Sequence, residues 1–154
     1  FETSKIEEVS QEEIILPALL QETGKFILAD LIASEKKSEL FKSKIASGAS
    51  VENVEKELLG VTTSQITAQI FRHWKLSDNL INMIEHVDDI SNANENFKKK
   101  SQILDVIKTA CNIKEPLSDE NVTKAIKKAT TYGFDIKILT KAIETLQDRL
   151  LDEK

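Results

Sequence analysis

The stretch that decides the fold class is SDENVTKAIKKATTYGFDIKILTKAIETLQDRL, residues 118–150. Apolar side chains recur in it every three or four positions, first over residues 122–129 and then over residues 136–150, which is the period of an amphipathic helix. Ser118 precedes the first run as an N-cap, and Gly133 follows it as a left-handed C-cap. The stretch therefore predicts two amphipathic helices joined by a short turn.

The same spacing continues outward through the rest of the chain, and no stretch has the alternating pattern of a strand. An apolar segment from Glu12 to Ala33 contains Pro17, which suits a first turn or a kink, and Gly24, which predicts a break into two helices. Further helices are predicted around residues 40–45, from 50 to a stop at Gly60, from 62 or 63 to 74, from 77 to 87 and around 103–111. The sequence therefore predicts an all-α protein, a compact bundle of seven to nine helices forming a single domain over residues 1–154.

Composition excludes several classes of function. The 154 residues carry 21 Lys and Arg against 26 Asp and Glu, a net charge of −5, which argues against a nucleic-acid binder because such a protein needs a basic surface. No run of 18 apolar residues could span a membrane. The single cysteine, Cys111, allows no internal disulfide, and a cytoplasmic protein is expected. Four isolated glycines form no phosphate-binding loop, and two histidines cannot make a His-rich metal site.

Two stretches resemble a known family. The first is LLQETGK, residues 19–25, and the second runs from ELLGVTT, residues 57–63, through WKLS, residues 74–77, to IEHV, residues 84–87. They resemble the HDOD family, output-domain relatives of the HD metal-dependent phosphohydrolases. In that family the first stretch typically reads Leu-Leu-His-Asp-Ile-Gly-Lys, and the second has Gly-x-Asp-His, then Trp-x-Leu-Pro, then a His-His pair. The resemblance covers Glu12 to about Leu151 and implies an HD-like fold.

The resemblance also identifies where this sequence departs from the metal site. Gln21 stands in the place of the histidine of the His-Asp pair, and Glu22 in the place of its aspartate. Two threonines, the second of which is Thr63, replace the Asp-His pair, and His86 with Val87 replaces His-His. One imidazole and one carboxylate remain, whereas a binuclear hydrolase needs several of each to hold two cations. We therefore expect a degenerate site with no metal, no cofactor and no enzymatic activity.

The residues that the family frame shares with this chain are expected to be structural. Gly24 and Gly60 would shape the two turns. Trp74 continues the apolar stripe of Ile66 and Ile70, so it is expected to be a buried core aromatic packed against the following helix.

The function implied by the resemblance is a non-enzymatic signal-transduction output or regulatory domain that acts through protein–protein contact with a signalling partner. An alternative is a vestigial HD pocket that binds a nucleotide or cyclic dinucleotide through Gln21, Thr63 and His86 without hydrolysis. A third possibility is a structural helical adaptor unrelated to the HD fold, in which these positions lie far apart.

The start of the sequence suggests a fragment. The first residue is Phe1, and HDOD members usually carry a further helical region on the N-terminal side, so the chain is expected to be the C-terminal part of such a domain. Its N-terminal segment, from Ile14 through Leu20 to Leu31, would then expose apolar side chains. A homodimer formed through this segment is expected, because a contiguous apolar patch is unstable in water.

Overall fold

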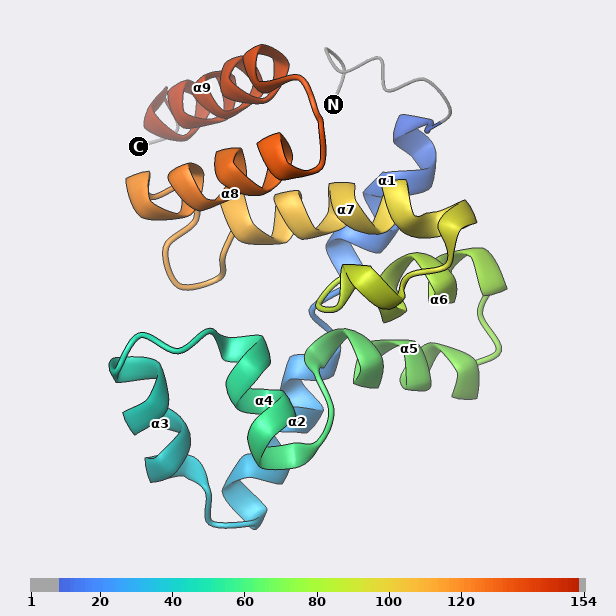
Figure 1. Cartoon of the computed structure of the whole chain (residues 1–154), viewed down its shortest axis with the longest axis vertical. Helices are drawn as coiled ribbons and strands as arrows, with labels where there is room; N and C mark the ends of the chain where they lie inside the picture. The colour runs from blue at the N-terminus through green and yellow to red at the C-terminus, as the bar shows by residue number, and fades with distance from the viewer. Residues whose placement is uncertain (1–8, 153–154) are drawn as a thin grey trace. The chain divides into compact units, whose positions relative to one another are not determined.

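The computed structural model describes residues 9–152, and these form nine α-helices, one short 3-10 helix and no strand (Figure 1). The all-α prediction and the predicted number of helices are confirmed for this part of the chain. The apolar segment near the N-terminus is divided into two helices at Gly24, as predicted, whereas Pro17 lies inside the first of them. The helices are α1 (Gln11–Leu20), α2 (Gly24–Ser34), α3 (Ser38–Ala46), α4 (Val51–Leu59), α5 (Thr63–His73), α6 (Asp78–Glu85), η1 (Ile90–Asn92), α7 (Glu95–Ala110), α8 (Asp119–Thr131) and α9 (Ile136–Asp152).

Side-chain caps fix where the helices begin. The hydroxyls of Ser50, Thr62, Ser77 and Ser118 each accept a hydrogen bond from the backbone N–H three residues later, at the starts of α4, α5, α6 and α8. Thr62 forms a full capping box, because the side chain of Gln65 also accepts from the Thr62 N–H at 3.0 Å. These starts follow from local sequence alone.

The described residues divide into two compact units. One consists of residues 19–101, and the other of residues 9–18 together with 102–152, so that the division falls inside α1 and α7. Residues 1–8 and 153–154, which the single-domain prediction also includes, lie outside the described part. No helix in the described part is both long and apolar enough to cross a membrane.

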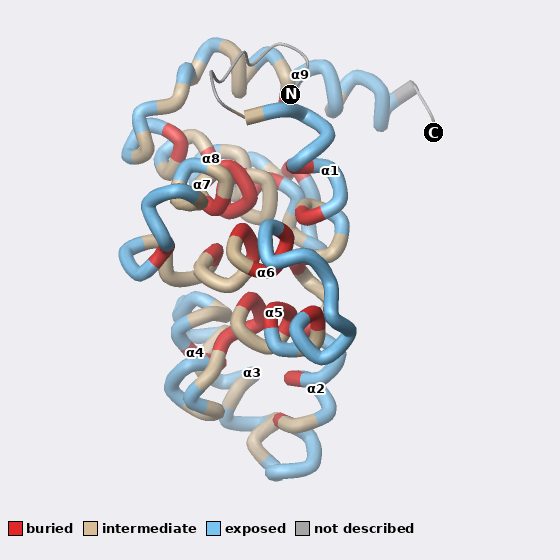
Figure 2. Tube along the Cα trace, turned by 90° about the vertical axis from the view of Figure 1, so that its right-hand side faces the viewer, coloured by how far each residue is buried: buried red, intermediate tan, exposed pale blue. Residues whose placement is uncertain are grey.

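The unit of residues 19–101 is built around α5, which packs against α2 and α6. Its core is formed by side chains from several helices, and Figure 2 shows the buried stretches of α5 and α6. Members of this core include Leu28 on α2, Val54 on α4, Phe71 on α5 and Ile84 on α6. This packing positions the starts of α2 and α5 beside each other.

The other unit has its own core between α7, α8 and α9, which includes Val106, Ala125 and Ile143. Beside it, the buried carboxylate of Asp105 accepts hydrogen bonds from the Tyr132 hydroxyl and from Lys128 Nζ, both at 2.6 Å. Two satisfied partners make this polar cluster a specific link between α7 and the end of α8.

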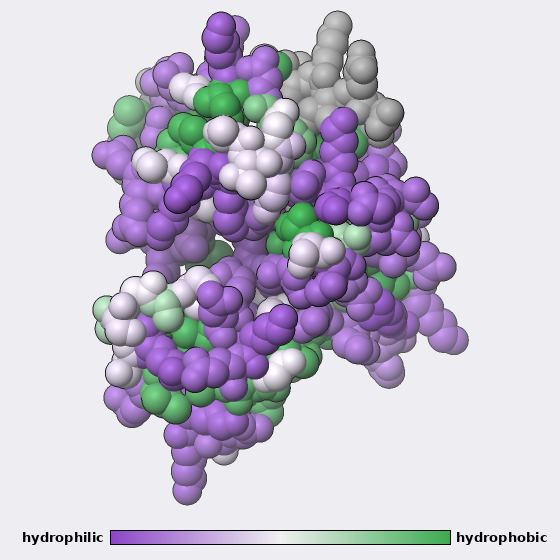
Figure 3. Space-filling view, in the orientation of Figure 1, coloured by the Kyte–Doolittle hydropathy of each residue, from purple (hydrophilic) through white to green (hydrophobic). Residues whose placement is uncertain are grey.

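Polar side chains dominate the face of the molecule that Figure 3 shows. On the face shown in Figure 3, hydrophobic side chains are divided into small separate groups among hydrophilic ones. Exposed large apolar residues nevertheless occur in the N-terminal segment, where Ile15, Leu16, Leu19, Phe26 and Ile27 are all at least half exposed or nearly so. By contrast, Ile14 and Leu28 in the same segment are buried.

Candidate functional site

The candidate positions gather around the first turn of α5. The turn between α1 and α2, residues 21–24, lies against this helix because Gly24 has no side chain. The Gly24 N–H donates to Thr67 Oγ1 at 2.9 Å. A Cβ at Gly24 would lie 2.5 Å from the Thr63 carbonyl oxygen. Glycine is therefore required here by close approach of two helices.

The hydroxyl of Thr67 ties this turn to α5. Besides accepting from Gly24, it lies 2.8 Å from the Thr63 carbonyl oxygen and 3.1 Å from the Gln21 carbonyl oxygen. A hydroxyl has one hydrogen, so it donates to one of the two carbonyls at a time. Gln21 itself is buried, and the neighbouring Glu22 forms an ion pair with Lys25. The backbone of Gln21 and that of Thr63 are thus brought together through one buried hydroxyl.

Thr63 is held by a carboxylate from α4. Its backbone N–H donates to Glu55 Oε2 at 2.8 Å, and its hydroxyl donates to Glu55 Oε1 at 2.7 Å. Both residues are buried. A carboxylate at this place is also favoured by the positive N-terminal end of α5. The two donors of Thr63 are therefore satisfied inside the protein.

Glu55 is not among the positions predicted from the sequence, although its place on the apolar side of its helix indicates a buried carboxylate. Val51, Val54 and Leu58 form an apolar stripe at helical spacing, and Glu55 falls on the same side of that helix. A carboxylate placed among core positions needs a partner, since an unsatisfied buried charge is costly. The partner is the start of the next helix, which follows after the turn at Gly60. Gly60 has φ +76°, a left-handed conformation that ends α4.

The end of α6 lies against the same turn of α5. Ser64 donates from its backbone N–H to Asp88 Oδ2 at 3.0 Å and from its hydroxyl to the Glu85 carbonyl oxygen at 3.2 Å. His86 lies between these two contacts and caps α6, and Val87 is buried. The His86 Nδ1 atom is inaccessible to solvent and has no hydrogen-bond partner among the described residues.

The structure thus brings the three segments that carry the candidate positions to the N-terminal end of α5. Hydrogen bonds between side chains and backbone groups link residues 21–24 and residues 85–88 to residues 63–67 of that helix. Within residues 9–152, no three His, Cys, Asp or Glu side chains are grouped so that they could hold a metal ion. This arrangement holds α4 and the end of α6 to α5 through hydrogen bonds from backbone N–H donors.

An ion pair between Arg72 and Glu85 adds to this link between α5 and α6. The Arg72 guanidinium donates to the Glu85 carboxylate, and this hydrogen bond raises the pKa of Arg72 above its ordinary value. Hydrogen bonds from Asn92 and Ser91 lower the pKa of Asp89. Both effects favour the charged forms of groups close to the candidate positions.

Trp74 corrects the expectation that it belongs to the core: its side chain is 59% exposed. Helix α5 ends at His73, and its buried side is Thr63, Thr67 and Phe71. Trp74 instead stacks on the outer side of Phe71, with ring centroids 6.2 Å apart. Periodicity correctly places it beside Ile66 and Ile70, but that stripe lies on the flank of α5 that lines a groove against α2, where Ile66 and Ile70 are half-buried.

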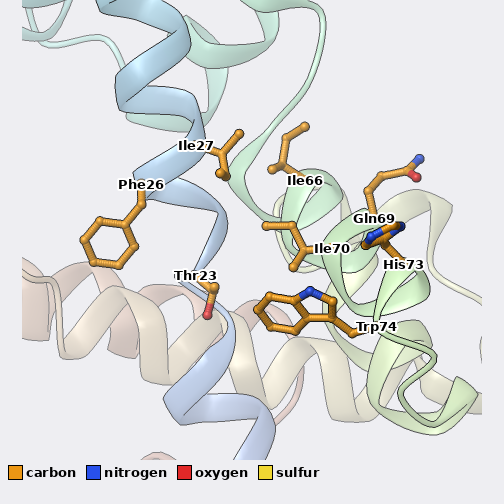
Figure 4. Close-up of a pocket in the computed structure, with 8 residues that line it drawn as sticks. All are labelled: Thr23, Phe26, Ile27, Ile66, Gln69, Ile70, His73 and Trp74. Carbon is orange, nitrogen blue, oxygen red and sulfur yellow. The ribbon is translucent and has the colours of Figure 1, made fainter.

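An apolar groove lies along this flank, between α2 and α5 (Figure 4). Its volume is about 560 Å³. Side chains of both helices line it, and none of them is Asp, Glu, Lys or Arg. The lining residues are Thr23, Phe26 and Ile27 from the α2 side and Ile66, Gln69, Ile70, His73 and Trp74 from the α5 side. We call this feature the α2/α5 groove.

Comparison with known proteins agrees with this architecture. The family model of the HDOD domain matches residues 3–90. The fold is similar to that of a virulence factor from Campylobacter jejuni, with a TM-score of 0.63 and 22% sequence identity over 90% of this chain and 54% of that one. The chain therefore spans about half the length of that protein. No curated protein matches the sequence.

The extent of the family match corrects one expectation. The resemblance predicts a match that reaches about Leu151 and concerns the C-terminal part of the family domain, whereas the match lies in the N-terminal part of this chain. The reason is that residues 91–151 carry only helical periodicity, which many families share. The matched region contains every candidate position from Gln21 to Val87.

Proposed function

Because the chain belongs to the HDOD family, we propose that it is a non-enzymatic regulatory domain that passes a signal through protein–protein contact. The observation that carries this proposal is the pairing of Thr63 with Glu55. Thr63 stands where the family pattern has a histidine, and both of its donors are bound by Glu55 at 2.7 and 2.8 Å. Because the donors of Thr63 are satisfied within the protein, this position offers no open ligand for a catalytic cation.

The surface supports contact with another protein. The α2/α5 groove leaves Trp74 and Phe26 in water, at 59% and 81% exposure. Tryptophan and other aromatic residues are enriched at protein interfaces, where they supply large contact areas. In this proposal the domain works in the cytoplasm, where its one cysteine needs no disulfide partner. The partner is a signalling protein that recognises the helical surface.

Metal content and hydrolysis test the absence of catalysis. We expect protein purified without chelator to contain no stoichiometric Fe, Mn, Zn or Ni by elemental analysis. Phosphodiester and nucleotide substrates should not be hydrolysed when these metals are added. One tightly held metal equivalent per chain, or metal-dependent turnover that is lost in Glu22→Gln, would contradict the proposal.

A second candidate function is binding of a nucleotide or cyclic dinucleotide in the vestigial pocket. It is favoured by one observation, the His86 Nδ1 atom that is buried without a hydrogen-bond partner among the described residues. A thermal-shift screen separates the two, because a ligand at 100 times its dissociation constant stabilises the native state by about 2.7 kcal/mol. A shift with wild type that is absent in His86→Ala would favour the second candidate.

A further inference from the structure

We propose that the α2/α5 groove is the interface of a symmetric homodimer, in which Phe26 of each copy inserts beside Trp74 of the other. This inference rests on the proposed function, protein–protein contact through the helical surface, and assigns this one groove to contact with a second copy of the chain. It uses only the unit of residues 19–101, in which the whole groove lies.

The groove has an exposed aromatic side chain, Phe26, beside a hollow that could receive one. Phe26 lines the groove, and Figure 4 shows its ring extending away from α5 while the Ile27 side chain points from α2 toward α5. The hollow beside it is about 560 Å³, which has room for an aromatic ring. A two-fold interface needs such self-complementarity, because each contact from the first copy to the second is repeated in reverse.

The exposed apolar area of the groove is large enough for a dimer interface. Phe26, Ile27 and Trp74 are 81%, 52% and 59% exposed. Phe and Trp side chains bury about 150–250 Å² each. With Ile27 taken as about 180 Å² on the same scale, the three side chains together expose about 400 Å² of apolar surface in each copy. Interfaces are about 60% apolar, so two copies would bury roughly 1,300 Å² in total. That value falls at the lower end of the range for specific interfaces, about 1,200–2,000 Å².

The groove lining carries no charged side chain, which favours a second copy over a charged partner. The chain has a net charge of −5, so two copies repel each other overall, and an interface without charged side chains adds no close like-charge contacts to this repulsion. The groove lining has no Asp, Glu, Lys or Arg. A strongly acidic or basic partner would find no opposite charge there, whereas a second copy meets no like charge.

The test compares Phe26→Glu with a matched control. Phe26 is the third residue of α2, and Leu40 is the third residue of α3 and 50% exposed. A carboxylate suits the first turn of a helix, so both Phe26→Glu and Leu40→Glu should fold, which circular dichroism checks. Light scattering over about 1–200 µM should show wild type and Leu40→Glu approaching twice the monomer mass. Phe26→Glu should stay at the monomer mass.

Trp74 provides a second readout because it is the one tryptophan of the chain. Acrylamide quenching of its fluorescence should decrease as the concentration of wild type or Leu40→Glu rises, and should not change for Phe26→Glu. A wild type that is monomeric throughout, with quenching independent of concentration, overturns the proposal. So does a Phe26→Glu protein that still dimerises. Neither result bears on metal content or hydrolysis, which test the proposed function separately.

Discussion

Replacing Gly24 with alanine should destabilise the protein by bringing a methyl group into the backbone of α5. The new Cβ would lie 2.5 Å from the Thr63 carbonyl oxygen, 2.7 Å from Thr67 Oγ1 and 2.9 Å from Thr67 N. Two of these atoms belong to the helix backbone, so side-chain rotation cannot remove the overlap. The start of α2 must move away from α5, and the hydrogen bond from the Gly24 N–H to Thr67 lengthens with it.

The magnitude follows from three contributions. Overpacking costs about 1–3 kcal/mol, and weakening the hydrogen bond costs about 0.5–1.5 kcal/mol. Alanine restricts the unfolded chain, which offsets about 0.4–1 kcal/mol of this loss. We therefore expect Gly24→Ala to lower the free energy of unfolding by about 2 kcal/mol. Urea denaturation followed by circular dichroism measures it.

A matched control separates crowding from backbone conformation. Gly48 has φ +93°, and a Cβ at this position would meet no atom within 4 Å, so Gly48→Ala tests the left-handed backbone alone and should cost about 1 kcal/mol. Thr67→Ala removes the acceptor of the Gly24 N–H, so the Gly24→Ala penalty should shrink by about 1 kcal/mol in that background. A Gly24→Ala protein as stable as wild type would refute the close approach of α2 and α5.

Three further changes test other parts of the structure. Glu55→Gln leaves a single oxygen acceptor for the two donors of Thr63 and should lower the free energy of unfolding by about 1–3 kcal/mol in urea denaturation. Burial, followed by the hydrogen bond to Asp105, raises the pKa of Tyr132 above its ordinary value of 10.0. Wild-type stability should therefore be retained below about pH 10 and fall above it. Tyr132→Phe should lose this alkaline dependence in a pH series of unfolding curves. Trp74→Ala should cost about 1 kcal/mol or less, well below the roughly 3–5 kcal/mol of a buried aromatic, because the ring is mostly exposed.

Helix boundaries could be predicted from the sequence because they depend on residues close together in the chain. Ser50, Thr62, Ser77 and Ser118 each cap a helix with their own side chain, three residues from the N–H that they accept. The left-handed stop at Gly60 is equally local. Such features need no knowledge of the tertiary structure, and all of them lie where the sequence predicts.

Contacts between helices could not be predicted in the same way. The hydroxyl of Thr67 bonds to Gly24 across 43 residues, and neither residue type indicates that partner. Trp74 shows a related limit. Periodicity places it on a stripe with Ile66 and Ile70, but only the position of α2 determines whether that stripe is covered. The stripe is left open, and so an expected core residue lines a groove.

The start of α5 is the point where hydrogen bonds join three helices of this HDOD domain. The N-terminal end of a helix carries partial positive charge and free N–H groups. In this chain Glu55 and Asp88 bring carboxylates to the N–H groups of Thr63 and Ser64, at 2.8 and 3.0 Å. These bonds join α4 and the end of α6 to α5, as shared coordination of a cation would do. A histidine at residue 63 would remove the hydroxyl that donates to Glu55 Oε1 but would keep the backbone N–H that donates to Glu55 Oε2, so we expect this substitution to weaken the link between α4 and α5 without abolishing it.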